Sequence, residues 1–170
     1  MMSGVGPAPP ASSHRPVTYP LVGPILPLGV GPTAPGRARA HVRATLAQWG
    51  LSAYADVAEL LMSEMVTNAV QASAGEHAGP EFRCGRLPVI VIHLVATRDG
   101  VVLEVWDTLP TSPSLGVPGA LQEHGRGLLL VDALAHRWDW RTVPDWPGKC
   151  VWAELDPSSL RSGLGTRAED

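Results

Sequence analysis

The 170-residue sequence is poor in several features that would each define a class of protein. Charge of one sign is scarce, because 13 lysines and arginines against 16 aspartates and glutamates give a net charge of −3. This balance argues against a dedicated nucleic-acid binder. No apolar run is long enough to span a membrane, and the N-terminus lacks the charged region and apolar run of a signal peptide. We therefore expect a cytoplasmic protein.

Cysteine and phenylalanine are also rare. The two cysteines, Cys84 and Cys150, lie far apart and have no second pair at metal-ligand spacing. We interpret them as reduced, small apolar residues of a cytoplasmic protein. One phenylalanine stands against six tryptophans, so indoles are the conspicuous aromatic groups.

The chain does contain enough apolar material for one folded domain. It is 45% hydrophobic and long enough to bury a substantial core. Residues 1–16 are rich in proline, alanine, serine and glycine, and we expect a disordered N-terminal tail there. Residues 17–156 make up the predicted domain, and residues 157–170 are expected to form a polar tail.

Hydrophobic periodicity divides this domain into strands and helices. Strand patterns cover 17–22, 89–96, 101–107, 136–143 and 149–155, and helical patterns cover 35–50, 52–73 and 125–135. Pro20 removes a ladder donor and marks an edge strand. Gly50 stands where a helix C-terminal cap belongs, and Ser52 can cap the next helix. Residues 23–36 are predicted to be an extended segment lying along the body.

The helix containing LLMSEMVTNAVQA (60–72) places an acid and an amide inside an apolar pattern. Glu64 and Asn68 are four residues apart and therefore share one helix face. In phosphoryl transfer an acid can accept the proton of an attacking hydroxyl, and an amide oxygen can hold a magnesium ion. The alternative is the solvated edge of an amphipathic helix.

Two further motifs follow in the chain. The strand 101–107 carries Asp107 at the end of its apolar row, where the alternative role is to cap a turn. Gly125, Arg126 and Gly127 then open a helix. Two glycines let the backbone approach a phosphate, the amides of the helix start favour its charge, and Arg126 adds a cation.

The order and spacing of these motifs resemble the GHKL superfamily of ATPases and kinases. The stretches SEMVTNAV and GKCVWAEL are most similar to the bacterial anti-sigma-factor serine/threonine kinases. The resemblance extends over about residues 17–155. It implies a two-layer α/β sandwich, in which a mixed, largely antiparallel sheet carries helices on one face and ATP lies between the layers.

Residue by residue, the resemblance implies specific roles. Glu64 matches the general base, and Asn68 matches the magnesium ligand. Asp107 matches the acid that accepts the exocyclic amine of adenine, a group that guanine lacks at that position. Gly125 and Gly127 match the glycines on the phosphate side.

The function implied by this resemblance is that of an ATP- and magnesium-binding regulator. It would transfer the γ-phosphate of ATP to a serine or threonine of a partner protein. The expected partner is a sigma factor or an anti-sigma antagonist, and a homodimer is a further possibility. We expect no direct contact with nucleic acid or membrane.

The sequence departs from the family pattern at the base-binding end. Asp107 is followed by Thr108, Leu109 and Pro110, where the family continues with glycines in the pattern DxGxG. Cys150 stands where family members often have a threonine that helps hold the adenine-reading acid. Two alternatives therefore stay open: a catalytically silent ATP-binding module, and a nucleotide-free protein-interaction module in transcription regulation.

The tryptophans predict a second surface. Trp138 and Trp140 share one face of their strand, whereas Trp106 and Trp152 alternate with apolar residues in theirs. We expect several indoles to gather on the sheet face away from the nucleotide. Residues 17–30 would cover them, or they would contact another protein or a second copy of the chain.

Overall fold

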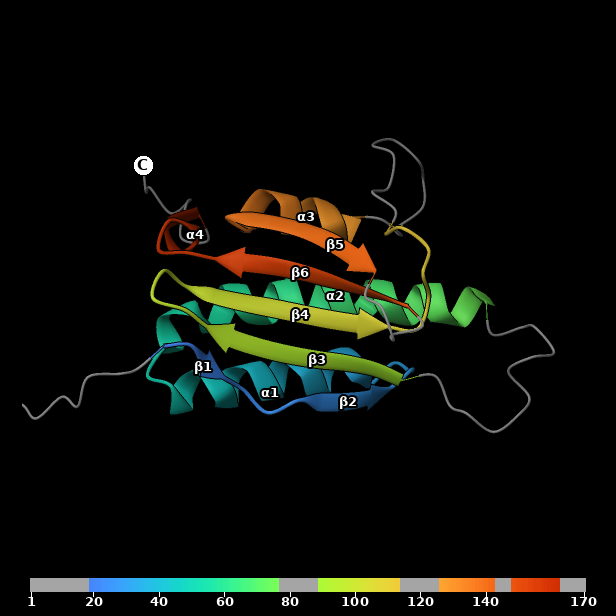
Figure 1. The fold of residues 1–170 in the computed structure, drawn as a ribbon, viewed down its shortest axis with the longest axis horizontal. Coiled ribbons are helices and arrows are strands. Elements are labelled where there is room, and N and C mark those ends of the chain that lie inside the picture. The colour runs from blue at the N-terminus through green and yellow to red at the C-terminus, as the bar shows by residue number, and fades with distance from the viewer. Residues whose placement is uncertain (1–18, 77–88, 114–125, 143–147, 163–170) are drawn as a thin grey trace, which may run out of the picture.

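A six-stranded sheet with helices packed against it makes up the fold (Figure 1). The computed structural model describes residues 19–76, 89–113, 126–142 and 148–162. The strands are β1 (Leu21–Val22), β2 (Leu26–Gly29), β3 (Val89–Ala96), β4 (Val101–Asp107), β5 (Arg137–Thr142) and β6 (Lys149–Leu155). The helices are α1 (Ala34–Gln48), η1 (Ser52–Tyr54), α2 (Ala55–Glu76), α3 (Arg126–Leu134) and α4 (Ser159–Ser162). Within the described ranges, no helix is long and apolar enough to cross a membrane.

The sheet is antiparallel at every strand pair in the described residues. Its order is β1-β3-β4-β6-β5, and β2 pairs with β3 beyond β1 along the same edge. Figure 1 shows α1, α2 and α3 lying together behind the sheet. The predicted two-layer α/β sandwich, with a largely antiparallel sheet and helices on one face, is confirmed.

Alternate side chains of the central strand β4 point toward the helix layer. It lies between β3 and β6, and its side chains alternate between the two sheet faces. Val101, Leu103 and Val105 are almost completely buried, and Asp107 continues the same row with an exposed fraction of only 1%. The apolar row therefore ends in a buried carboxyl group.

The first two long helices form an antiparallel pair under this sheet. Gly50 follows the C-terminal end of α1 and has φ +72°, the left-handed conformation expected just after a helix C-cap. Ser52 starts the short helix η1, so the prediction that it caps the next helix is wrong, because α2 begins only at Ala55. Leu61 and Met62 of α2 are completely buried. The packing of α2 against α1 and β4 holds the middle of this helix in place.

The N-terminal segment joins the sheet and does not cover it. Leu26 to Gly29 pair with Ile92 to Val89 of β3, and the Gly23 N–H donates to the Leu94 carbonyl at 2.9 Å. Residues 26–29 are therefore extended, as predicted, but the prediction that they cover the body is wrong, and residues 34–36 already belong to α1. An edge strand satisfies its backbone through β3, a pairing that the local pattern of prolines did not reveal.

The four tryptophans of strands β4, β5 and β6 divide between the two faces of the sheet. Trp138 and Trp140 lie opposite Ala153 and Val151 and pack against the core on the helix side. Trp106 and Trp152 lie on the outer face. The expectation that several indoles gather on the outer face holds for Trp106 and Trp152 but is wrong for Trp138 and Trp140, because the β5–β6 register turns the β5 pair inward.

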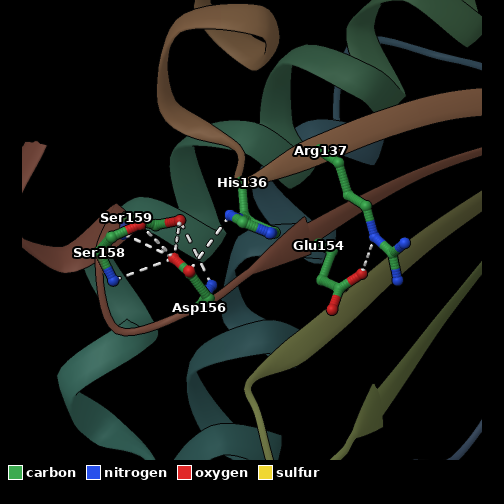
Figure 2. Close-up of polar contacts among 6 residues, drawn as sticks. All are labelled: His136, Arg137, Glu154, Asp156, Ser158 and Ser159. Carbon is green, nitrogen blue, oxygen red and sulfur yellow. Dashed lines mark hydrogen bonds and ion pairs between the residues drawn. The ribbon is translucent and has the colours of Figure 1, made fainter.

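Arginines stack on the outer indoles. The Arg141 guanidinium lies 5.6 Å from the centroid of the Trp106 ring, and Arg137 lies 5.7 Å from that of Trp152. Figure 2 shows Arg137 at the same time forming an ion pair with Glu154 on the neighbouring strand. In the described residues, the outer face is thus a layer of paired charges and stacked rings.

The chain continues past β6 as a capped helical turn. The Asp156 carboxylate accepts hydrogen bonds from the backbone N–H groups of Ser158 and Ser159, at 2.9 and 3.0 Å, and pairs with His136 at 3.2 Å (Figure 2). Leu160 packs against the core. Residues 157–162 therefore differ from the polar tail predicted there, because the cap organises α4 and lets an apolar residue reach the core.

Candidate functional site

One end of the sandwich brings together the segments that carry the sequence motifs. The end of β4 and the beginnings of β6 and α3 lie toward the right-hand end of Figure 1, and α2 runs behind the sheet toward the same end. Two groups of residues occupy this end. We call Glu64, Asn68 and Gly127 the helix site, and Asp107, Leu109 and Lys149 the strand-end corner.

The helix site begins with the spacing of two polar residues in α2. Glu64 and Asn68 are one turn apart on the same face, and both side chains are partly buried. The neighbouring Met65 and Val66 are buried in the core, which fixes the rotation of the helix about its axis. The apolar pattern of α2 therefore aims the acid and the amide at the start of α3.

Gly127 brings the backbone of α3 directly against these two side chains. A Cβ atom at this position would lie 2.6 Å from Glu64 Oε2, 3.3 Å from Glu64 Cβ and 3.4 Å from Asn68 Nδ2. No side chain larger than hydrogen fits there unless Glu64 moves. Gly127 also lies in the first turn of α3, where backbone N–H groups lack partners within the helix and favour an anion.

Asn68 is left with an unused donor. Its Nδ2 atom is buried and has no hydrogen-bond partner among the described residues. A buried donor without a partner costs about 1–3 kcal/mol, so this position favours a ligand that accepts from it. A carboxylate, a carboxamide and the amides of a helix start are together suited to phosphate oxygens with a magnesium ion. The helix site therefore fits a magnesium-bound phosphate group.

The strand-end corner is built differently, around a buried ion pair. Lys149 Nζ lies 3.0 Å from Asp107 Oδ1 and 2.9 Å from Oδ2, and it also donates to the Leu109 carbonyl at 3.1 Å. The Leu109 N–H donates to Asp107 Oδ1 at 2.9 Å. Exposed fractions of the two charged side chains are only 4% for Lys149 and 2% for Asp107. The chain itself therefore supplies partners to this carboxylate.

Lys149 was not predicted as a site residue, although the sequence contains a signal for it. Lys149 is the only lysine in the chain, and it belongs to the same alternating row as Val151, Ala153 and Leu155, which face the core. A lysine in an apolar row needs a buried anion. The β4–β6 register supplies it by placing Lys149 directly opposite Asp107.

Cys150 has a different position from the one that the resemblance implied. It pairs with Trp106, so it belongs to the opposite row of β6 from the row that faces the Asp107 carboxylate. Its side chain is buried, and this burial raises the pKa of the thiol to about 12. The thiol stays protonated near neutral pH, as expected for a small apolar residue.

The structure thus brings three of the predicted site residues, Glu64, Asn68 and Gly127, into one cluster. Asp107 lies in the adjoining corner, at the end of the strand on which α2 packs. Arg126 is the first residue of α3, and its side chain lies outside the described part of the structure. Gly125 and Cys84 lie in segments that the structure does not describe.

Comparison with known proteins identifies the family of the domain. The family model described as histidine kinase-like ATPase domain matches residues 31–155, nearly three quarters of the chain, and includes both residue groups. The comparison with curated proteins gave no match. A match of this extent, over a two-layer sandwich with an antiparallel sheet, assigns the domain. The chain belongs to the histidine kinase-like ATPase domain family, whose members generally bind ATP with magnesium.

Proposed function

We propose that the protein transfers the γ-phosphate of ATP to a serine or threonine of a partner protein, in the manner of the anti-sigma-factor kinases that its sequence resembles. The observation that carries this proposal is the helix site, where an acid, an amide with an unused buried donor and a glycine backbone meet. The partner would be a sigma factor or an anti-sigma antagonist.

Each residue of the helix site has a defined task in this proposal. Glu64 accepts the proton of the attacking hydroxyl while the hydroxyl oxygen forms the new bond to the γ-phosphorus. Asn68 would hold a magnesium ion through its amide oxygen and would donate from Nδ2 to a phosphate oxygen. Gly127 lets the amides of the α3 start approach the phosphate closely. The bond between the γ-phosphorus and the oxygen that bridges it to the β-phosphate breaks, and ADP departs, while a bound magnesium ion would supply counter-charge.

In this proposal, Asp107 positions the base of the nucleotide. In the proposal, its carboxylate faces the exocyclic amine of adenine at the end of β4, between the sheet and α2. The buried position of Asp107 at the end of an apolar row supports this role, because a planar base needs apolar walls and one polar group to orient it.

Calorimetric titration of ATP, with and without magnesium, tests the proposal. Asn68→Ala is expected to weaken magnesium-dependent binding by roughly tenfold or more, which corresponds to one lost charge-assisted contact. Gln71→Ala is the matched control, because it removes an exposed amide from the same helix. Equal effects of the two substitutions would contradict the assignment of Asn68.

Transfer of labelled phosphate tests the role of Glu64. Glu64→Gln should leave ATP binding within about twofold and lower transfer to a candidate partner, or release to water, by about a hundredfold or more. Glu59→Gln is the control, since Glu59 lies on the same helix but pairs with Arg43 of α1. Undiminished transfer in the Glu64 variant would show that another group is the base.

A second candidate function is favoured by the strand-end corner. The Asp107 carboxylate is engaged by Lys149, which would suit a protein-interaction module that binds nucleotide weakly or not at all. ATP titrations that produce no binding heat, combined with an unchanged melting temperature at saturating ATP, would favour this alternative. A ligand at a hundred times its dissociation constant should otherwise add about 2.7 kcal/mol to the stability.

A further inference from the structure

We propose that Lys149 determines nucleobase specificity in this protein, by holding the Asp107 carboxylate and so weakening its preference for adenine. The inference rests on the proposed function, in which Asp107 faces the base. It concerns the opposite end of the nucleotide from the helix site, so the two can be tested separately.

The Lys149 ammonium has two partners from the chain, the Asp107 carboxylate and the Leu109 carbonyl. Its Nζ atom lies 3.0 and 2.9 Å from the two Asp107 oxygens and 3.1 Å from the Leu109 carbonyl oxygen. A lysine has three donors and no acceptor, and the two oxygens of one carboxylate lie too close together to take two separate N–H groups, so these partners in the described residues leave a donor for a ligand. Only 4% of the Lys149 side chain is exposed, so the ion pair with Asp107 holds its ammonium in the corner, away from water.

An adenine amine would have to compete with this arrangement. Asp107 Oδ1 already accepts from both Lys149 and the Leu109 N–H, and the side chain is 2% exposed. Hydrogen bonds from a charged donor are about twice as strong as those from a neutral one. The ammonium therefore outcompetes the neutral amine for the carboxylate oxygens that they would share.

The backbone keeps Lys149 in place. Gly148 precedes it, and a Cβ atom there would lie 2.0 Å from the Asp107 carbonyl oxygen and 2.5 Å from the Thr108 carbonyl carbon. The start of β6 is thus packed directly on the end of β4, opposite Asp107 in the ladder. Lys149 is consequently part of the rigid sheet.

The pair also changes what the corner can recognise. A carboxylate alone only accepts hydrogen bonds, and so it prefers the amine of adenine to the carbonyl oxygen of guanine. An ammonium beside it adds a donor, which a guanine carbonyl can accept. We expect the wild-type protein to bind ATP and GTP with dissociation constants within roughly tenfold of each other.

The test compares ATP and GTP titrations, each with magnesium, for the wild type and Lys149→Met. Methionine keeps the length and apolar stem of lysine and releases the carboxylate. The substitution should tighten ATP binding by about tenfold or more, leave GTP binding unchanged or weaker, and so raise the ATP preference. Arg141→Met is the matched control, because it removes a cation from the outer face of the sheet.

A further pair of variants guards against loss of folding. Lys149→Gln is neutral but keeps donors for Asp107, and it should shift the preference toward ATP in the same direction. Asp107→Asn/Lys149→Met removes both charges and should abolish the gain in ATP affinity.

The single lysine also provides a spectroscopic measurement on the wild type. In protein made with ¹³C-lysine, the Lys149 Cε resonance should move when ATP or GTP binds, but much less with inorganic triphosphate, which lacks a base. An equal response to all three ligands would contradict contact between Lys149 and the base.

The outcomes separate this inference from the proposed function. If the Lys149 variants bind ATP no better than wild type, with an unchanged ATP preference, while Asn68→Ala still weakens binding, the role of Lys149 is wrong and the proposed function stands. If no variant and no wild-type protein binds a triphosphate, both are wrong. Binding of ATP by Lys149→Met alone would strongly support the role of Lys149.

Discussion

The helix site and the strand-end corner lie at the same end of the sandwich, but they treat their polar groups in opposite ways. At the helix site, the Asn68 Nδ2 atom is buried with no partner among the described residues. In the corner, the charges of Lys149 and Asp107 are paired with each other, and Leu109 adds a hydrogen bond to each of them. The first arrangement leaves interaction energy for a ligand, whereas the second uses it for folding.

This difference predicts which substitutions should affect stability and which should affect binding. Groups that the fold already satisfies are expensive to remove, because their partners stay buried without compensation. Groups that the fold leaves unsatisfied can be removed with little loss of stability, but the ligand loses its contact.

Removing the carboxylate of the corner should have the largest effect. Asp107→Ala leaves the Lys149 ammonium buried without its anion, and we expect a loss of about 3–5 kcal/mol in the free energy of unfolding. Denaturant unfolding measures it. Asp107→Ala/Lys149→Met should recover most of the loss, since no charge remains buried. A loss below about 1 kcal/mol in the single variant would mean that the pair does not stabilise the fold.

Adding one methyl group at either end of the β4–β6 pair should be nearly as costly. A Cβ atom at Gly148 would lie 2.0 Å from the Asp107 carbonyl oxygen, and one at Gly100 would lie 1.8 Å from the Leu155 carbonyl oxygen. Both clashes involve backbone atoms, so Gly148→Ala and Gly100→Ala should each cost about 3 kcal/mol. Only the Gly148 variant should also change the ratio of ATP to GTP affinity, because only this variant disturbs the corner.

The same change at the helix site should affect binding and spare stability. In Gly127→Ala, the nearest atom to the new methyl group is the end of the Glu64 side chain, which can rotate away. Alanine is also favoured over glycine in a helix by about 0.8–1 kcal/mol, so we expect a net stability change below about 1 kcal/mol. Magnesium-dependent ATP binding should weaken by roughly tenfold, because the methyl group displaces the acid and blocks close approach. Unchanged binding would show that the phosphate does not approach this glycine.

The smallest effect is expected at Asp156, a carboxylate with several donors that lies at the surface. Hydrogen bonds, first from Ser158 and then from Ser159, together with the charge of His136, lower its pKa from an ordinary 3.8 to about 2 (Figure 2). A lowered pKa stabilises the folded state above pH 3.8, and this contribution disappears as the pH falls through about 2. The difference in melting temperature between wild type and Asp156→Asn should therefore be small at pH 6 and shrink toward pH 2. A difference as large as that of Asp107→Ala would show that burial is not what makes the corner costly.

Much of the helix layer and the central hairpin could be predicted from local patterns. The near-continuous apolar run of β3 and the alternation of β4 gave both strands with their observed bounds, 89–96 and 101–107. The four-residue spacing of Glu64 and Asn68 placed both on one face of α2. These features depend on residues that are close in sequence, so the period of the backbone is sufficient to predict them.

The failures of prediction have a common origin in long-range pairing. Nothing local shows that residues 26–29 pair with 92–89 of β3, or that the β5–β6 register turns Trp138 and Trp140 toward the helices. Lys149 and Asp107 are 42 residues apart. Shifting the β4–β6 register by one residue would place them on opposite faces, which is why the ion pair could not be predicted from composition or spacing.

By itself, the sequence determined the two central strands and the helix face that carries the acid and the amide, and its resemblance to the GHKL superfamily implied the two-layer architecture. The tertiary structure alone decided how the carboxylate at the end of β4 is used, because the partners of a buried group depend on strand order and register. A polar group in the core must be satisfied by whatever the fold brings next to it. For Asn68 the described residues bring no partner to its buried donor, and for Asp107 the fold brings the only lysine in the chain.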